Sequence, residues 1–172
     1  GENPTTVMNF GAPGLDYVQD MEILSKEKYE SVMGIKLNPL SFLVTYHPTT
    51  LEGKERENPK EAIGELLSAL DEFPEATLIF TKANADTHGR VINESIAAYV
   101  AKNSSRATLF DSLGSFKYLN TINQVTALVG NSSSGIIEGP LFKKPTVNLG
   151  HRQEGRLKAD SIIDVPARCE AI

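Results

Sequence analysis

The sequence contains a single cysteine, Cys169, and no tryptophan. One cysteine cannot form a disulfide within the chain, and a thiolate metal site needs several. The lack of disulfides is typical of a reducing compartment, so we expect a cytoplasmic protein. No apolar run approaches the roughly 18 residues that a membrane-spanning helix requires. We therefore expect no membrane partner.

Basic residues are also few, because 17 Lys and Arg stand against 22 Asp and Glu, for a net charge of −5. Nucleic-acid-binding proteins present a broad basic surface, so no nucleic-acid partner is expected. Any anionic ligand must be held by a local group of donors. The chain does not begin with methionine, and Gly1–Pro4 has neither the basic nor the apolar stretch of a secretory signal. We expect both ends to be internal to a longer protein.

The sequence does have apolar runs of strand length that alternate with segments of helical periodicity. Hydrophobic residues make up 40% of the 172 residues, which suffices for one domain with a core. Strands are expected at Ser41–Tyr46, Ala76–Thr81, Ala107–Phe110, Thr126–Gly130, Pro145–Leu149 and Ser161–Val165. Helices are expected at Asn58–Phe73, with Phe73 on the apolar face, and at Val91–Ala101, Ser115–Ile122 and Ser133–Phe142. This alternation predicts a doubly wound α/β fold around a parallel sheet.

Polar residues follow the first three strands, at the sheet edge where doubly wound folds bind ligands. His47 follows the first strand and Asn84 the second, and each can contact a ligand or simply belong to its loop. Asp111 and Ser112 follow the third strand, where backbone groups can contact a base or side chains can cap the next helix. His88 is expected to be solvated.

The most informative junction follows the fourth strand, where Asn131-Ser132-Ser133-Ser134-Gly135 runs into a helix. Free backbone N–H groups, serine hydroxyls and the positive end of the helix dipole favour a bound phosphate or diphosphate. Helix capping accounts for one serine but hardly for three. The spacing is neither that of a G-x-G-x-x-G fingerprint nor that of a P-loop. Glu138 follows on the same helix, where a carboxylate can accept hydrogen bonds from both ribose hydroxyls or be merely solvated.

The segment Gly150–Arg156 after the fifth strand contains two arginines and two glycines. Forked guanidinium groups such as that of Arg152 suit a diphosphate, although a basic loop can also be plain surface. The serine-rich helix start on the same sheet edge favours anion binding. The histidines are scattered and no acidic cluster has ligand spacing, so we expect chemistry without a metal.

The run GNSSSGIIEGPLFKKPTVNLGHRQEGRLKADSII, Gly130–Ile163, resembles the UDP-N-acetylglucosamine 2-epimerases. It is most similar to the hydrolysing branch that supplies N-acetylmannosamine for sialic acid synthesis. Three further segments fit the same family in order: GAPGLD at Gly11–Asp16, TYHPTT at Thr45–Thr50 and SLGSFKYL at Ser112–Leu119. Together they cover nearly the whole chain.

The resemblance implies an architecture in which two Rossmann-like halves form a GT-B-type fold, with the active site between them. This sequence matches the second half. Residues 1–16 would be a hinge or linker from the first half, and residues 17–172 would be the nucleotide-binding domain, with further helices after it. The full-length protein would form a homo-oligomer.

The resemblance also implies roles for the residues after the strands. His47 would lie near the diphosphate and take part in catalysis, and Asn84 would belong to the nucleotide-sugar pocket, with Asp86 beside it. Ser112 and its neighbours would contact uracil through backbone groups. The remaining contacts would come from the later loops: Ser132 and Ser133 to the diphosphate, Glu138 to the ribose and Arg152 to a phosphate.

The implied reaction is loss of UDP by elimination across C1–C2 of UDP-N-acetylglucosamine, followed by addition of water that releases N-acetylmannosamine. It needs no cofactor. The carboxylates that move the C2 proton belong to the first half in this family, so this chain alone should bind nucleotide weakly and not turn over. Three alternatives stay open: a GDP-linked bacillosamine-type substrate, a non-catalytic nucleotide-sugar-binding module, and a glycosyltransferase. A non-hydrolysing epimerase is disfavoured, because the segments Asn131–Gly135 and Gly150–Arg156 suit the hydrolysing branch better.

Overall fold

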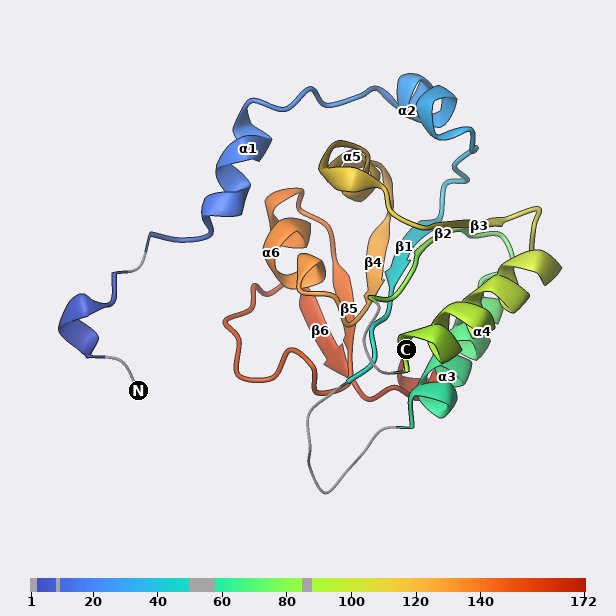
Figure 1. Cartoon of the computed structure of the whole chain (residues 1–172). Helices are drawn as coiled ribbons and strands as arrows, with labels where there is room; N and C mark the ends of the chain where they lie inside the picture. Colours follow the sequence, from blue (N-terminus) through green and yellow to red (C-terminus); the bar gives the residue numbers. More distant parts are fainter. Residues whose placement is uncertain (1–2, 9, 50–57, 85–87) are drawn as a thin grey trace.

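The computed structural model describes residues 3–8, 10–49, 58–84 and 88–172, so the interpretation of Asp86 lies outside the described residues. Six parallel strands form one sheet in the order β3-β2-β1-β4-β5-β6 (Figure 1). The strands are β1 (Ser41–Thr45), β2 (Thr77–Thr81), β3 (Ala107–Phe110), β4 (Ala127–Gly130), β5 (Thr146–Leu149) and β6 (Ile162–Val165). The predicted doubly wound, Rossmann-like fold is confirmed.

The helices connect successive strands or precede the first of them. They are α1 (Asp16–Gln19), α2 (Lys26–Met33), α3 (Pro59–Asp71), α4 (Gly89–Lys102), α5 (Gly114–Gln124) and α6 (Ser134–Leu141). Three short 3-10 turns complete the described elements: η1 (Pro4–Thr6), η2 (Pro13–Leu15) and η3 (Cys169–Ala171). The chain leaves the middle of the sheet in both directions, so β1 and β4 lie side by side at the switch point where such folds bind ligands.

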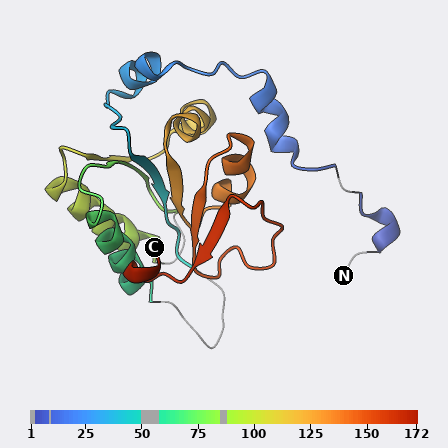
Figure 2. The same ribbon diagram turned by 180° about the vertical axis from the view of Figure 1, so that it is seen from behind.

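Two apolar clusters cover the two faces of the sheet. In the view from behind, α3 and α4 lie on one side of the sheet and α5 and α6 on the other (Figure 2). One cluster joins α3 and α4 to the sheet through buried side chains such as Leu66, Ile96 and Phe80. The other joins α2 and α5 through Tyr29 and Ile122. Strands covered on both faces lose their polar alternation, which explains the continuous apolar runs in the sequence.

The segment before Met21 lies outside these layers, at the edge of the molecule (Figure 1). Its described residues include exposed apolar side chains, of which Phe10 is 80% exposed, and Met21 is the first buried one. The predicted boundary at residue 16 falls at the start of α1 and stays a prediction.

One local prediction was wrong. Phe73 was expected on the apolar face of the helix between β1 and β2, but that helix, α3, ends at Asp71. Phe73 is part-exposed and packs edge-on against Phe42, with ring centroids 5.6 Å apart. Helix α2 was not predicted, although Ser25 caps it by accepting from Lys28 N. The other predicted elements differ from the observed ones by no more than two residues at either end.

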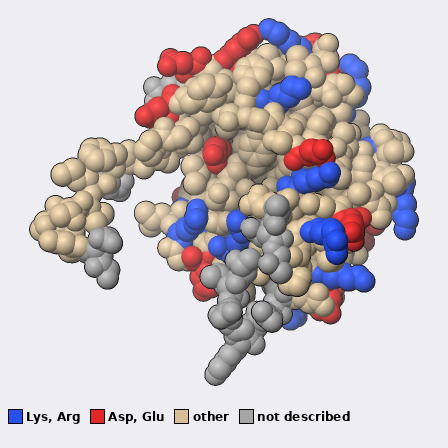
Figure 3. Space-filling model, viewed as in Figure 1, with Lys and Arg blue, Asp and Glu red and all other residues tan. Residues whose placement is uncertain are grey.

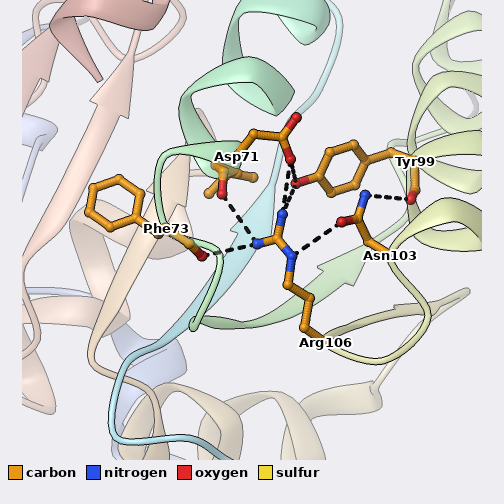
Figure 4. A network of polar contacts seen from close by, with 6 residues as sticks. Asp71, Phe73, Tyr99, Asn103 and Arg106 are labelled. Carbon is orange, nitrogen blue, oxygen red and sulfur yellow. Dashed lines mark hydrogen bonds and ion pairs between the residues drawn. The ribbon is translucent and has the colours of Figure 1, made fainter.

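A polar network around Arg106 closes the opposite end of the sheet from the carboxyl edge (Figure 4). Arg106 immediately precedes β3, and its side chain is 12% exposed. Its guanidinium donates to Asp71 Oδ1, Tyr99 Oη, Asn103 Oδ1 and the carbonyl oxygens of Leu70 and Phe73. A buried guanidinium needs such partners, so this network fixes the ends of α3 and α4.

Within the described part of the chain, no helix is both long and apolar enough to span a bilayer.

Candidate functional site

A cavity of about 540 Å³ lies at the carboxyl edge of the sheet, and residues after β1, β2, β3 and β4 line it. Its volume falls within the range of about 300–1,000 Å³ that is usual for small-molecule sites. Five of the seven residues predicted from the sequence line it: His47, Asn84, Ser112, Ser132 and Glu138. Ser133 and Arg152 lie nearby but are not among the lining residues.

His47 is held by both of its neighbouring loops. It follows β1 and is 8% exposed. Its backbone N–H donates to Asn131 Oδ1 (2.7 Å), and its carbonyl oxygen accepts from Asn131 Nδ2 (2.8 Å). Its ring nitrogen Nδ1 accepts from the backbone N–H of Asn84 (3.1 Å). The structure therefore gives this histidine a fixed place in the cavity wall.

Asn84 has an exposed side chain on the cavity, and its backbone positions the His47 ring. The loop before it is held by Asn93 of α4, whose Oδ1 accepts from Ala83 N (2.7 Å) and whose Nδ2 donates to Ala83 O (3.4 Å). The side chain of Asn84 is thus available to a ligand while its main chain is fixed. His88 is exposed, as expected.

Ser112 lies just before the start of α5, and its predicted contact with a base stays a prediction. It lines the cavity, and its Oγ accepts from the backbone N–H of Gly114, the first residue of α5 (3.3 Å). Gly114 has a φ of +61°, a conformation that suits glycine. Leu113, Gly114 and Ser115 also line the cavity.

The three serines before α6 do not face the same way. Ser132 and Ser134 line the cavity, and Ser132 Oγ accepts from Ser134 N (3.3 Å). Ser133 is the N-cap residue, and its carbonyl oxygen accepts from the N–H groups of Ile136 and Ile137. A helix turns each successive side chain by about 100°, so Ser133 leaves the face that Ser134 occupies. Its predicted contact with the diphosphate stays a prediction.

Glu138 lies one turn beyond Ser134 on the same face of α6. Burial raises the pKa of its carboxyl group, while the neighbouring Ser134 hydroxyl opposes that rise. Ser134 Oγ and Glu138 Oε2 are both buried and have no geometrically defined hydrogen-bond partner among the described residues. A buried polar atom without a partner costs stability, so these two atoms mark a place where a ligand can form hydrogen bonds.

Arg152 and Gln153 reach the site from the loop after β5. Arg152 Nη1 donates to the carbonyl oxygen of Asn131 (3.0 Å), and Gln153 Nε2 donates to the same oxygen (2.8 Å). Gln153 is only 1% exposed. Arg152 therefore lies beside the serine-rich helix start, as predicted for an anion-binding arginine, although its predicted phosphate contact is untested.

Sequence reasoning missed several residues of the cavity and its support. Asn131 directly follows β4, at the sheet edge where doubly wound folds bind ligands, so its position could be predicted. Nothing in the sequence indicates that it contacts His47. Thr45 and Thr81 share a hydroxyl hydrogen bond of 2.7 Å on the cavity wall. Lys82 and Asp111 form an ion pair at the cavity rim. Asp111 was named from the sequence as following the third strand, and Lys82 directly follows β2, so its position at the same sheet edge could also be predicted.

Electrostatics at the site are local. On the face seen in Figure 3, acidic and basic side chains are interspersed, without one broad basic surface. Among the described residues, no three His, Cys, Asp or Glu side chains are placed to hold a metal ion together. Donors for an anion come instead from the start of α6, whose first turn carries no acidic residue.

The chain forms a Rossmann-like domain of the GT-B type, with a cavity at the carboxyl edge of the sheet beside the start of α6. The solved structure of UDP-GlcNAc 2-epimerase from Methanocaldococcus jannaschii shares this fold, with a TM-score of 0.59 and 17% identity. The match covers 84% of this chain and 41% of that chain. The chain belongs to the UDP-N-acetylglucosamine 2-epimerase family, whose sequence profile matches residues 1–172. The predicted family is confirmed.

Two curated relatives are considerably more similar in sequence. The chain is 46% identical to the GDP/UDP-N,N'-diacetylbacillosamine 2-epimerase (hydrolyzing) of Campylobacter jejuni, over 95% of this chain and 42% of that protein. It is 36% identical to the polysialic acid biosynthesis protein P7 of Escherichia coli, over 100% of this chain and 43% of that protein. The chain thus spans about two fifths of the length of these relatives.

Proposed function

We propose that this chain is the nucleotide-binding half of a hydrolysing 2-epimerase that acts on a nucleotide-linked 2-acetamido sugar. The observation that carries the proposal is the convergence of His47, Ser132, Ser134 and Glu138 on one cavity at the start of α6. Two buried atoms there, Ser134 Oγ and Glu138 Oε2, have no geometrically defined hydrogen-bond partner among the described residues. This combination suits a diphosphate followed by a ribose.

A nucleoside diphosphate fits the order of groups along the cavity. The diphosphate would lie at the start of α6, where Ser132 and Ser134 offer hydroxyls and the helix dipole favours negative charge. The ribose would lie one helical turn further along, with its two hydroxyls on Glu138. The base would then contact the Ser112–Gly114 turn, and Arg152 would approach a phosphate oxygen from the loop after β5.

The reaction begins with elimination. A base removes the proton from C2 of the sugar, the C1–C2 double bond forms, and the C1–O bond breaks with its electron pair on the diphosphate. Water then adds its hydroxyl to C1 and a proton to C2 from the opposite face, which inverts C2. Negative charge grows on the diphosphate as C1–O breaks. Donors aimed at it therefore stabilise the transition state more than the substrate.

This chain supplies the leaving-group side of that reaction. His47, Ser132 and Ser134 would hold and neutralise the departing diphosphate. The groups that move the C2 proton would come from the part of the protein that this chain does not span. We therefore expect nucleotide binding but no turnover from the 172 residues alone.

The relatives support a second candidate substrate beside the one suggested by the sequence. The sequence suggested UDP-N-acetylglucosamine, the sugar nucleotide in the family description. The Campylobacter jejuni relative, at 46% identity, is named for GDP- or UDP-linked N,N'-diacetylbacillosamine. That identity favours the diacetylated sugar as a second candidate, and both candidates share the same elimination chemistry.

Binding is tested first, by the thermal stabilisation of this chain in separate concentration series of UDP and GDP. A ligand at 100 times its Kd stabilises by about 2.7 kcal/mol, which shifts Tm by several degrees in a domain of this size. Stabilisation by UDP or GDP, but not by inorganic phosphate at equal concentration, supports the proposal. No shift with either nucleotide would remove its main support.

Turnover is tested on a protein that spans the full length of the relatives. UDP-N-acetylglucosamine, UDP-diacetylbacillosamine and GDP-diacetylbacillosamine are supplied separately, and release of free nucleotide and free sugar is followed. When the reaction is run in D2O, the proposal expects the 2-epimerised free sugar to carry deuterium at C2. Retention of the C2 hydrogen, or transfer of the sugar to an acceptor, would contradict the mechanism.

A further inference from the structure

Asn131, in the loop after β4, makes hydrogen bonds to the loops after β1 and β5 although it is 0% exposed. Its side chain bridges the backbone of His47, accepting from His47 N and donating to His47 O. Its backbone N–H donates to Thr45 O (3.1 Å). Its carbonyl oxygen accepts from Arg152 Nη1 and Gln153 Nε2. One buried residue thus connects the loops after β1, β4 and β5.

The approach of these loops depends on the residue before Asn131. Gly130 ends β4 with a φ of +138°, and a Cβ at this position would overlap the carbonyl oxygen of Thr45. The same oxygen accepts from Asn131 N. Glycine therefore permits the close contact between β1 and β4 that brings the Asn131 side chain onto the His47 backbone.

The contacts of the His47 ring select one protonation form. Its Nδ1 accepts a hydrogen bond from Asn84 N, so Nδ1 carries no proton. The proton of the neutral imidazole is then on Nε2. Because Asn131 fixes the main chain of His47 while Asn84 fixes its ring, both the position and the tautomer of the imidazole are determined.

We propose that Asn131 is a positioning residue that holds His47 in the Nε2-protonated form required to donate a hydrogen bond to the diphosphate. This inference rests on the proposed function for the identity of the ligand, but its structural part concerns the ligand-free chain. Asn131 also anchors Arg152, so the two donors that approach the diphosphate from different loops share one support.

The ligand-free chain provides the first test. At about pH 8.5, well above the ordinary histidine pKa of about 6.5, the ¹⁵N shifts of the ring nitrogens show which one carries the proton. Signals of His47 are assigned from their loss in His47→Gln. We expect the Nε2-protonated tautomer to dominate at His47, whereas the exposed His88 should show a mixture. A dominant Nδ1-protonated form at His47 would overturn the proposal whether or not any variant folds.

The second test compares two buried asparagines. Asn131→Ala removes the bridge to His47, and Asn120→Ala is the matched control. Asn120 is also 0% exposed and joins two segments, accepting from Leu24 N and donating to Glu22 O, but it does not line the cavity. Asn131→Ala should mix the His47 tautomers and weaken binding of UDP or GDP by about tenfold or more, since hydrogen bonds to charged groups contribute that much. Asn120→Ala should do neither.

The conservative variant Asn131→Asp keeps an acceptor for His47 N and should retain the tautomer. Unchanged tautomer and affinity in a folded Asn131→Ala, or the same changes in Asn120→Ala, would overturn the proposal. Failure of the proposed function gives a different result: the wild-type chain would bind neither UDP nor GDP, while the His47 tautomer would still follow Asn131.

Discussion

Replacing Glu138 by glutamine should weaken nucleotide binding. A charged acceptor contributes about 1.5–3 kcal/mol per hydrogen bond and a neutral one about 0.5–1.5 kcal/mol. The exchange therefore costs about 1–1.5 kcal/mol per ribose hydroxyl. For two hydroxyls the sum is about 2–3 kcal/mol, which corresponds to a Kd about 30-fold to 150-fold higher. The shape of the side chain is kept, so the loss reflects charge.

The same substitution should stabilise the ligand-free chain at neutral pH. Burial raises the pKa of the Glu138 carboxyl group in the folded state above the ordinary value of 4.5. The stability linked to this group is present below pH 4.5 and is lost as the pH rises through the folded-state pKa. At pH 7 the ionised carboxylate therefore costs stability, and Glu138→Gln removes that cost. The gain should shrink as the pH falls through the folded-state pKa, and it should be absent below pH 4.5.

Two measurements check this pair of opposite effects. Calorimetric titration with UDP or GDP gives the affinity, and urea unfolding at pH 7 and pH 4 gives the free energy of unfolding. A 2′,3′-dideoxy nucleoside diphosphate is the control ligand, because it lacks both hydroxyls and should bind wild type and Glu138→Gln equally. An equal loss of affinity with the dideoxy ligand would refute the assignment of Glu138 to the ribose.

Three further substitutions test the site and its frame. Ser134→Ala should weaken UDP or GDP binding by about tenfold or more, since a hydrogen bond to the charged diphosphate is lost. Urea unfolding should show no loss of stability, because the buried Oγ has no geometrically defined partner among the described residues. Gly130→Ala should lower the free energy of unfolding by about 2 kcal/mol or more, because of its positive φ and the overlap with the Thr45 carbonyl; an unchanged urea midpoint would contradict this. Arg106→Met should lower the free energy of unfolding by about 2–4 kcal/mol in the same assay, because the hydrogen bonds of the guanidinium to the ends of α3 and α4 are lost. Its nucleotide Kd should equal that of wild type, and a changed Kd would show coupling between the two ends of the sheet.

The order of strands and helices could be predicted because each strand is covered on both faces, and each longer helix has an apolar stripe. Helix α2 was not predicted because it buries few apolar side chains, chiefly Tyr29 and Met33, and these stand among charged residues. Its signals were local: the capping Ser25 and the left-handed Gly34 that ends it. Periodicity alone is a weak guide to so short a helix.

The residues of the site could be predicted where they are neighbours along the chain. They could not be predicted where they meet through the pairing register of the strands. Serines at a helix start and a glutamate one turn later are local features, so Ser132 and Glu138 were found. The bridge from Asn131 to His47 joins residues 84 positions apart, and it exists because Gly130 pairs with Thr45 in the parallel register. Likewise, no composition rule says that Gln153 turns inward while its neighbour Arg152 reaches the site.

The strand order also separates the parts of the cavity in a way that bears on how such proteins diverge. His47 and Asn131 follow the two central strands, β1 and β4, where any change disturbs neighbours on both sides. The Ser112–Gly114 turn follows β3, an edge strand with one neighbour. Insertions and substitutions in that turn therefore alter one wall of the cavity without moving the histidine. The wall that we propose for the base can thus change independently of the site that we propose for the diphosphate.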